Sequence, residues 1–518
     1  MDTPTPAGPH SDTAPLGDPR RTWRVRDDRR LPALDPLAHA VRRRTPVSSR
    51  EVVWDSEDRV LAGVGLELTE SAGAWSLDRG SGPVPLPPDH DHDHDDDGDG
   101  DGDGDGDADD AVSPPRDQVE VFLRGRTLLP VLLRDTTTTL VTVAGKDGRP
   151  RAEVADVRVD EGTPDTAVLR SARWWALSDD GGHGVVARAV ERALDDAAEN
   201  AGDAPGSGDD LATAPRRLPP VRRTSTARRP RRGTAAAFAV AALDALRTDL
   251  VAVEPRVRAD EDDAVHEFRK VLRRIRSVLA VHRGALDRDA SGALRSALAT
   301  VSRVAGVARD AEVLRDGLAH SAALAPAGYV DPGASRFLRA HVDDLRQQAT
   351  ADLRRTLRSA RWFAALDSLD DLVDRAPVGP DGSMPVDRFV ARRVERERRR
   401  LRRVVARTPD LVGRRGPETD ELERLHDARK AARRLRYALE AVDAGVDIGE
   451  RHLGRLQRVQ DALGAGLDAA RAAQAYRDVA ELARSRGEDT FAFGVLATVE
   501  HNAAEHHLRR GRTLLDRL

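Results

Sequence analysis

The distribution of apolar residues divides the chain into two parts. Between about residues 22 and 175, short segments alternate apolar and polar positions, which is the period-two pattern of half-buried strands. From residue 234 onward, apolar residues recur every three to four positions in segments separated by Gly and Pro, as in amphipathic helices. The pattern predicts a two-domain α+β protein, with an N-terminal antiparallel β domain and a C-terminal all-α domain.

The β domain is expected at residues 21–185. Several of its segments are bounded by Gly, Asp or Pro, and Lys-Asp-Gly-Arg at 146–149 has the composition of a hairpin turn. A tail at residues 1–20 and an insertion at 83–117 hold too few apolar residues to order themselves, so we expect both to be disordered. The expected strands lie at residues 47–55, 63–69, 74–77, 118–123, 138–143 and 152–159.

The helical domain is expected at residues 233–518, after a linker at 186–232. The linker holds one short amphipathic segment, then a Gly/Ser/Asp-rich stretch and an Arg-rich tract whose prolines exclude a long helix. Two repeats are expected within the helical domain, at about 233–375 and 385–518.

A basic stripe marks a helix expected at residues 266–279. Its cations recur at helical spacing along one face, while Phe268, Leu272 and Ile275 take the opposite face. Cations at this spacing repel one another, so a stripe without intervening acids favours an external polyanion. The stripe consists of His266, Arg269, Lys270, Arg273, Arg274 and Arg276.

The same stripe occurs a second time, 160 residues later. The chain has only three lysines among its 83 Lys and Arg residues, and two of them occupy the matched position in the two stripes. Gly306 and Asp310 after the first stripe match Gly464 and Asp468 after the second, at an offset of 158. Two matched blocks in the same order indicate an internal duplication. The second stripe consists of His426, Arg429, Lys430, Arg433, Arg434 and Arg436.

A further basic face is expected on a helix at residues 389–407. Its exposed side carries Arg396, Arg399, Arg400 and Arg403, with Leu401 turned away. The second repeat would then have two neighbouring basic helices, whose basic faces could converge on a shared groove.

Composition narrows the class of protein. Residues 89–110 hold 13 Asp, so the net charge of −5 conceals a charge of +8 on the rest of the chain. The absence of Cys excludes disulfides and thiolate metal sites and fits a reducing compartment. We find no apolar run of about 18 residues and no apolar N-terminal segment, so we expect a cytoplasmic protein without a membrane partner.

The Asp-rich insertion raises two questions of its own. His90, His92 and His94 stand among its aspartates, but no fixed geometry is expected there, so we read any metal binding as adventitious. The polyanionic run at 89–110 could instead compete within the molecule for the basic stripes.

The doubled segments resemble a known family. H-E-F-R-K-V-L-R-R-I-R and H-D-A-R-K-A-A-R-R-L-R-Y, each followed by its Gly-to-Asp block, are similar to the CHAD domain, the conserved histidine α-helical domain. The resemblance covers residues 234–518. It implies two pseudo-symmetric four-helix bundles with a basic central surface that binds inorganic polyphosphate. We expect both stripes, the face at 396–403 and Tyr437, which ends the second segment, to hold the phosphates.

The β part resembles a degenerate CYTH, or triphosphate-tunnel, domain. The similar segments lie at residues 52–68, 123–131 and 147–159. The family's metal-binding Glu-x-Glu-x-Lys strand should fall near residues 22–28, but no Glu occurs there, and the first Glu of the chain is Glu51. Hydrolysis of a triphosphate needs carboxylates to hold divalent cations. We therefore expect no catalytic residues, no metal site, no cofactor and no enzymatic activity.

Polyphosphate binding is the function that these observations favour, with association to polyphosphate granules as its extension. Nucleic acid or another polyanion is an alternative partner, although aromatic residues make up only 3% of the chain and no RRM, KH or zinc-finger pattern is found. Residual triphosphatase activity of the β domain is a second alternative. A third is that the stripes are solvated outer faces paired with acids elsewhere. Whether the two stripes face one cavity distinguishes polyphosphate binding from the interpretation of the stripes as solvated outer faces.

Overall fold

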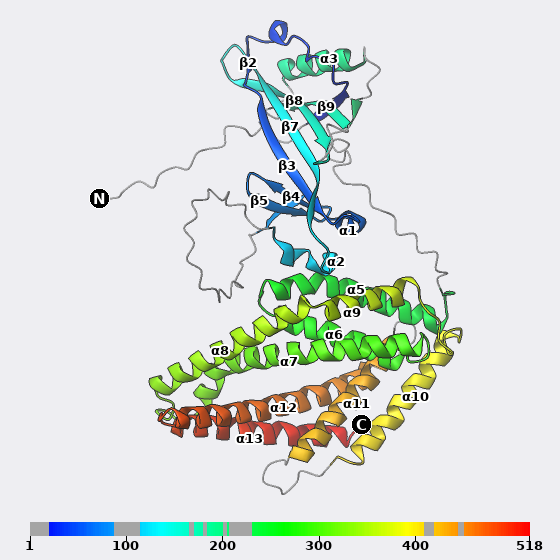
Figure 1. Ribbon diagram of the computed structural model, residues 1–518, viewed down its shortest axis with the longest axis vertical. Coiled ribbons are helices and arrows are strands. Elements are labelled where there is room, and N and C mark those ends of the chain that lie inside the picture. The colour runs from blue at the N-terminus through cyan, green and yellow to red at the C-terminus, as the bar shows by residue number, and fades with distance from the viewer. Residues whose placement is uncertain are drawn as a thin grey trace, which may run out of the picture. The chain divides into compact units, whose positions relative to one another are not determined.

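The computed structural model describes residues 20–86, 114–164, 170–179, 184–199, 205–206, 230–408, 419–443 and 450–518. The chain splits into two compact units, Met1–Arg223 and Thr224–Leu518. The first unit is mainly an antiparallel sheet and the second is helical (Figure 1). The predicted two-domain α+β layout is therefore confirmed.

The sheet of the first unit has the strand order β10-β1-β9-β8-β7-β3-β4-β5-β6, and β2 pairs with β7 beside this path. Each of its strand pairs is antiparallel. The strands are β1 (Arg21–Val25), β2 (Ala40–Arg43), β3 (Val47–Asp55), β4 (Glu67–Ser71), β5 (Ala74–Asp78), β6 (Pro83–Leu86), β7 (Leu129–Ala144), β8 (Pro150–Gly162), β9 (Arg170–Asp179) and β10 (Pro205–Gly206).

The long hairpin of β7 and β8 forms the middle of this sheet. Its turn is the predicted Lys-Asp-Gly-Arg segment, where Gly148 adopts a φ of +73°. The Gly145 N–H donates to the carbonyl of Arg149 at 3.0 Å and closes the turn. Glycine suits this turn because it adopts positive φ without the steric penalty of a Cβ atom.

Two expected strands are wrong or shortened. Residues 116–123 form the 3-10 helix η2 (Arg116–Gln118) and the helical turn α2 (Glu120–Leu123) in place of a strand at 118–123. Two left-handed residues after Leu123 reverse the chain, and the buried Glu120 carboxylate accepts the N–H of Gly125 at 2.6 Å. Within residues 63–69, α1 (Val60–Gly63) ends before β4 begins, and Asp55 accepts two N–H groups of α1.

The boundaries of the insertion and the linker also differ from expectation. Pro83–Leu86 is strand β6 at the edge of the sheet, where proline is tolerated because one side of the strand needs no donor. Helix α3 (Val185–Glu199) buries Ala187, Val190 and Leu194 in the same core as Trp23, so this segment belongs to the first unit and not to a linker that starts at 186. The tail at 1–19, the histidines of the insertion and the Asp run lie outside the described residues.

The second unit contains two sets of helices in the same order. Helices α5 to α9 fall within the first expected repeat and α10 to α13 within the second; α9 is additional to the four helices that the resemblance implies. The helices are α5 (Ala235–Arg258), α6 (Ala264–Val281), α7 (Arg288–Leu324), α8 (Pro332–Leu357), α9 (Ala360–Asp374), α10 (Val386–Val405), α11 (Thr419–Asp443), α12 (Glu450–Ser485) and α13 (Phe491–Leu515).

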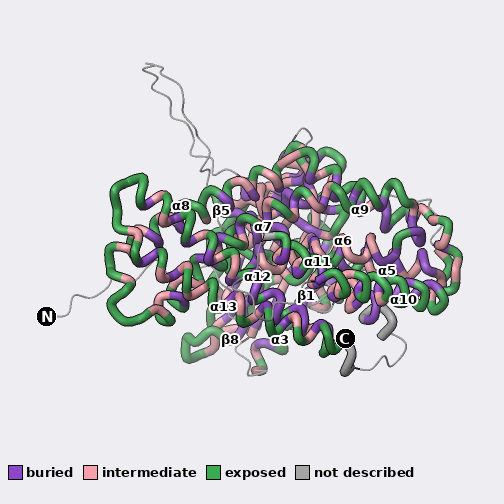
Figure 2. The backbone as a smooth tube through the Cα atoms, turned by 90° about the horizontal axis from the view of Figure 1, so that it is seen from below, coloured by how far each residue is buried: buried purple, intermediate pink, exposed green. Residues whose placement is uncertain are grey.

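Helices α6 and α11, which carry the two stripes, are each followed by a long helix, α7 or α12. The two sets meet where α6 contacts α11 and α7 contacts α13. In Figure 1 the green helices α6 and α7 accordingly lie next to the orange helices α11 and α12. Figure 2 shows buried positions recurring along these helices between exposed ones, as amphipathic packing requires. The duplication thus brings the two stripe-bearing helices together.

Polar side chains start several of these helices. Thr234, Asp287, Asp331 and Ser359 accept N–H groups of the first turns of α5, α7, α8 and α9. Such N-caps satisfy donors that the helix itself leaves unpaired. They fix where each helix begins and therefore which of its residues face the partner helices.

Candidate anion-binding cavity

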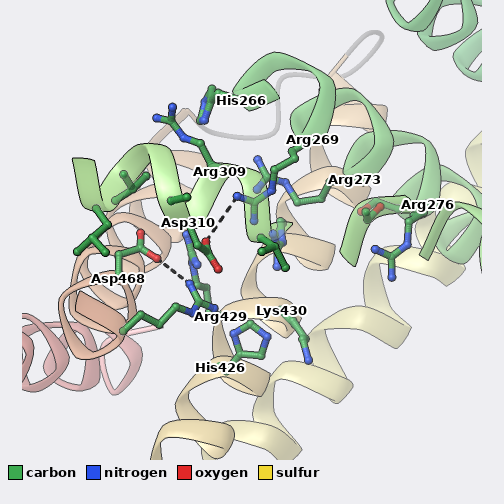
Figure 3. Close-up of a pocket in the computed structure, with 18 of the residues that line it drawn as sticks. His266, Arg269, Arg273, Arg276, Arg309, Asp310, His426, Arg429, Lys430 and Asp468 are labelled. Atoms are coloured by element: carbon green, nitrogen blue, oxygen red, sulfur yellow. Dashed lines mark hydrogen bonds and ion pairs between the residues drawn. The ribbon is translucent and has the colours of Figure 1, made fainter. Parts of the chain in front are cut away.

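Both basic stripes line one cavity of about 670 Å³ in the helical unit. Its walls come from α6, α7, α11 and α12, with one residue from α8. Figure 3 shows the labelled residues of α6 on one side and those of α11 on the other. The stripe residues that line the cavity are His266, Arg269, Arg273 and Arg276 of α6 and His426, Arg429, Lys430, Arg433 and Arg434 of α11.

Three predicted stripe residues, and Tyr437 beside the second stripe, do not line this cavity. Lys270 pairs with Glu267 on its own helix at 3.0 Å, and Arg274 is exposed. Arg436 bonds to Gln457 and lies 5.1 Å from the centre of the Tyr437 ring. Four residues therefore lie beside the cavity and are not part of its wall: Lys270, Arg274, Arg436 and Tyr437. This differs from the expectation that the whole stripe forms one binding face.

The basic face of α10 stands apart from the cavity. Arg396, Arg399, Arg400 and Arg403 are all exposed, and none of them is among the lining residues that the structure describes. Burial lowers the pKa of Arg434, and Arg400 is close enough to lower it further. Among the described residues, the expected convergence of the basic faces of α10 and α11 is therefore limited to the neighbourhood of Arg400 and Arg434.

Several cavity arginines form no ion pair with any acidic side chain that the structure describes. Within the described residues, no ion pair is formed by Arg273, Arg276, Arg433 or Arg434, and the Nε atoms of Arg273 and Arg276 are buried without a hydrogen-bond acceptor. An unsatisfied buried donor costs about 1–3 kcal/mol, and more when it carries charge. In this respect the cavity differs from a solvated helix face, whose cations gather carboxylates around them.

The pKa values reflect the same accumulation of positive charge. Burial, and then Arg273 and Arg429, lower the pKa of Arg433 to about 10. Burial, followed by Lys430 and Arg471, lowers the pKa of His426 to about 4, so its imidazole is neutral at pH 7. Burial is also the main cause of lowered pKa values at Arg269, Arg276, Arg429 and Arg434. An anion in the cavity would relieve the part of these shifts that comes from repulsion between the cations.

The duplicated Gly and Asp residues position arginines at this cavity. A Cβ atom on Gly464 would lie 2.7 Å from Nη2 of Arg429, whereas one on Gly306 would lie 3.9 Å from Nη2 of Arg269. Glycine at 464 therefore lets the Arg429 guanidinium approach the backbone of α12. Figure 3 shows Asp310 beside Arg269, with 3.8 Å between carboxylate and guanidinium.

Gly464→Ala is expected to weaken anion binding about threefold to tenfold without destabilising the domain. The new methyl group displaces only the end of the flexible Arg429 side chain, and alanine favours a helix over glycine by about 1 kcal/mol. Gly306→Ala is the matched control, because its methyl group meets Arg269 at an ordinary contact distance. Titration calorimetry and thermal unfolding of both variants test this; equal affinity losses in the two would contradict it.

The structure also adds residues that the stripes did not indicate. Arg309 precedes Asp310 on α7, and Arg471 follows Asp468 by one turn on α12, where it pairs with that carboxylate at 2.9 Å. Both stand next to the duplicated Gly and Asp residues, which was the available signal in the sequence. Arg295 of α7 also lines the cavity, and no repeat or motif marked it.

A second cluster of charges lies inside the sheet of the first unit. The side chain of Arg134 on β7 is only 4% exposed and pairs with Glu51 and Glu67 at 3.1 Å and with Glu161 at 3.0 Å. Burial alone would lower the pKa of Arg134, but these carboxylates raise it above its usual value. The three glutamates are thus held on a guanidinium. Among the described residues, no group of three or more His, Cys, Asp or Glu side chains could hold a metal ion.

Comparisons with known proteins show which family part of the chain resembles. Two curated relatives, uncharacterized protein MT2285 of Mycobacterium tuberculosis strain CDC 1551 and uncharacterized protein Rv2226 of strain H37Rv, are each 34% identical over 255 residues. These alignments cover 48% of this chain and 47% of each relative, so the chain spans about half the length of the curated relatives it matches.

Two solved structures are also similar to the chain. PptA from Streptomyces chartreusis aligns over 55% of this chain and 99% of that structure, with 24% identity and a TM-score of 0.46. The CHAD domain from the plant Ricinus communis aligns over 56% of this chain and 96% of that structure, with 21% identity and a TM-score of 0.42.

No helix in the described part of the chain has the length and apolar character needed to cross a membrane.

The family model described as CHAD domain matches residues 241–477, which include α6, α7, α11 and the cavity-lining part of α12. Residues 241–477 of this chain are therefore a CHAD domain.

Proposed function

We propose that the cavity of the CHAD domain binds inorganic polyphosphate without catalysing a reaction. The observation that supports this proposal most directly is the set of unpaired arginines, which two duplicated helices direct into one cavity. Guanidinium groups bind phosphate oxygens through paired, charge-assisted hydrogen bonds. A linear chain of phosphates supplies such oxygens at every unit, and it presents no base or sugar that would need further recognition.

Titration of the protein with inorganic polyphosphate at several salt concentrations tests this proposal. Each phosphate that is neutralised releases counterions, so the logarithm of the affinity should fall linearly with the logarithm of the salt concentration. No binding at low salt would refute the proposal. A fluorescent fusion is expected to collect on cytoplasmic polyphosphate granules, and a Gly464→Ala fusion less strongly; a diffuse wild-type signal in cells that contain granules would contradict that localisation.

Nucleic acid remains the main alternative partner, and the cavity lining argues against it. None of the described residues that line the cavity is Phe, Tyr or Trp, the side chains on which unpaired bases usually stack. At equal phosphate concentration, polyphosphate should therefore displace single-stranded DNA or RNA from the protein. Displacement in the opposite direction would favour the alternative.

The sheet unit is proposed to lack triphosphatase activity, whether or not it belongs with the CYTH domains. Glu51, Glu67 and Glu161 all contact Arg134, which leaves the carboxylates engaged with an internal cation. Release of phosphate from tripolyphosphate or ATP in the presence of Mg²⁺ or Mn²⁺ is the direct assay. Turnover above that of an Arg134→Ala, Glu67→Ala variant would overturn this part of the proposal.

Polyphosphate affinity is expected to rise about threefold when the pH falls from 7.5 to 6. His426 has a pKa of about 4 in the empty cavity, and a bound polyanion raises that pKa, so binding and proton uptake are coupled. The affinity gain is present below the bound-state pKa and is lost as the pH rises through it. A bound polyanion would act on Asp310 in the same direction as burial, which raises the pKa of its carboxyl group.

Calorimetry in buffers of different ionisation enthalpy measures this proton uptake, and His426→Gln should reduce it.

The folding stability of the domain without ligand depends on pH with the opposite sign. Because the pKa of His426 in the empty folded state lies below its unfolded value, the empty domain loses stability as the pH falls from about 6.5 towards 4. Buried His282, whose pKa burial also lowers to about 4, adds to this loss. A polyphosphate affinity that is independent of pH would contradict the coupling between binding and proton uptake.

A further inference from the structure

Part of the cavity wall is apolar and lies open to water. Val307 is 60% exposed, and Val313 and Leu345 are each 40% exposed, although all three line the cavity. A chain of phosphates gains nothing from such side chains. Covering exposed apolar surface, in contrast, is favourable by about 25 cal/mol per Å².

The apolar residues are grouped on particular helices. Val307, Ala311 and Leu314 follow one another at helical spacing on α7, and Ala472 and Ala475 do so on α12. Leu345 of α8 adds to them, while α11 contributes only basic residues to the cavity. The cavity therefore has a cationic wall on α6 and α11 and an apolar strip on α7, α8 and α12.

Two carboxylates keep phosphates on the cationic wall. Asp310 and Asp468 belong to the same helices as the apolar strip and both line the cavity. Burial raises the pKa of Asp310, and the nearby Asp468 carboxylate acts in the same direction. The arginines beside them already face acids, since Arg309 pairs with Glu312 and Arg471 with Asp468, both at 2.9 Å. A phosphate placed there would meet negative charge without an unpaired cation.

We infer that the cavity accepts phosphate chains that end in an aliphatic group, with the diphosphate or triphosphate on the α6 and α11 arginines and the aliphatic group on the apolar strip. This inference rests on the proposed function and specifies a second class of ligand for the same site. The strip consists of Val, Leu and Ala, with no aromatic side chain among the described lining residues, so its chemistry fits an alkyl or prenyl chain rather than a nucleobase.

Calorimetric titration of the whole protein with geranyl diphosphate and methyl diphosphate tests the inference, because the two esters have the same charge and linkage. Geranyl diphosphate is expected to bind about tenfold more tightly. Val307→Thr combined with Leu345→Asn should remove this advantage and leave the affinity for methyl diphosphate unchanged. Leu324→Asn is the matched control, since Leu324 is 55% exposed on α7 but does not line the cavity.

Equal affinities for the two esters would overturn the inference, as would tighter binding of adenosine 5′-diphosphate than of geranyl diphosphate. Inorganic tripolyphosphate, titrated in parallel, separates this outcome from failure of the proposed function. If tripolyphosphate binds and the geranyl group brings no gain, phosphate binding stands and the aliphatic ligand class is rejected. If none of the phosphates binds, both proposals are rejected.

Discussion

Replacing Arg273 and Arg433 together by alanine is expected to lower polyphosphate affinity by about 100-fold at low salt and to flatten its salt dependence. The two guanidinium groups approach each other from α6 and α11, since Arg273 is the neighbour that most lowers the pKa of Arg433. A hydrogen bond to a charged group contributes about 1.5–3 kcal/mol, so the loss of two such groups readily accounts for this change. Titrations at several salt concentrations measure both effects.

The Arg273→Ala, Arg433→Ala variant should lose affinity without losing thermal stability. Removing two cations that repel their neighbours is expected to leave the thermal midpoint of the empty domain unchanged or higher, with full helical circular dichroism. Arg339→Ala with Arg402→Ala is the control, because both arginines are exposed and neither lines the cavity. Equal loss of affinity in the control would show that net charge, and not the cavity, binds the polyanion.

Arg134→Ala is expected to destabilise the sheet unit by about 3–5 kcal/mol, the usual consequence of leaving buried charges without their partner. Three glutamates surround this guanidinium, and burial already raises the pKa of Glu67 despite the presence of Arg134. Urea unfolding followed by tryptophan fluorescence should show an earlier transition of the sheet unit. Helical circular dichroism reports the CHAD domain separately.

Arg50→Ala provides the control for this prediction. Arg50 pairs with Asp135 on the same pair of strands, but both side chains are largely exposed, so the substitution should change stability little. Adding Glu67→Gln to Arg134→Ala should restore part of the lost stability, since it removes one uncompensated charge. If Arg134→Ala unfolds at the same urea concentration as the natural chain, the buried cluster does not stabilise the sheet.

The sequence predicted the two helices that carry the stripes, but it did not predict which residues of each stripe line the shared cavity. Residues 266, 269, 273, 276, 277 and 280 of α6 line the cavity, and most of them follow the spacing of three and four that marks the seam between packed helices. An amphipathic stripe covers a wider arc than such a seam. Lys270 and Arg274 belong to the stripe but point past the seam, and only the position of the partner helix decides this.

The errors in the first unit have a similar origin. Val119, Val121 and Leu123 alternate like strand residues, yet they are buried in helical turns because α2 packs against the neighbouring loop and strands. A segment this short is assigned by its tertiary contacts rather than by its periodicity. Arg134 was not singled out either, because nothing local distinguishes an arginine that will be enclosed by three distant glutamates.

Under the proposed function, the unpaired arginines of the cavity tie the lifetime of the folded domain to the supply of polyphosphate. An occupant that neutralises them binds the folded chain alone, so at 100 times its Kd it adds about 2.7 kcal/mol to the free energy of unfolding. When phosphate reserves are consumed, this contribution disappears and a larger fraction of molecules is open to proteases. On that proposal, the protein would be removed fastest in starved cells, and its abundance would follow the amount of polyphosphate that can bind it.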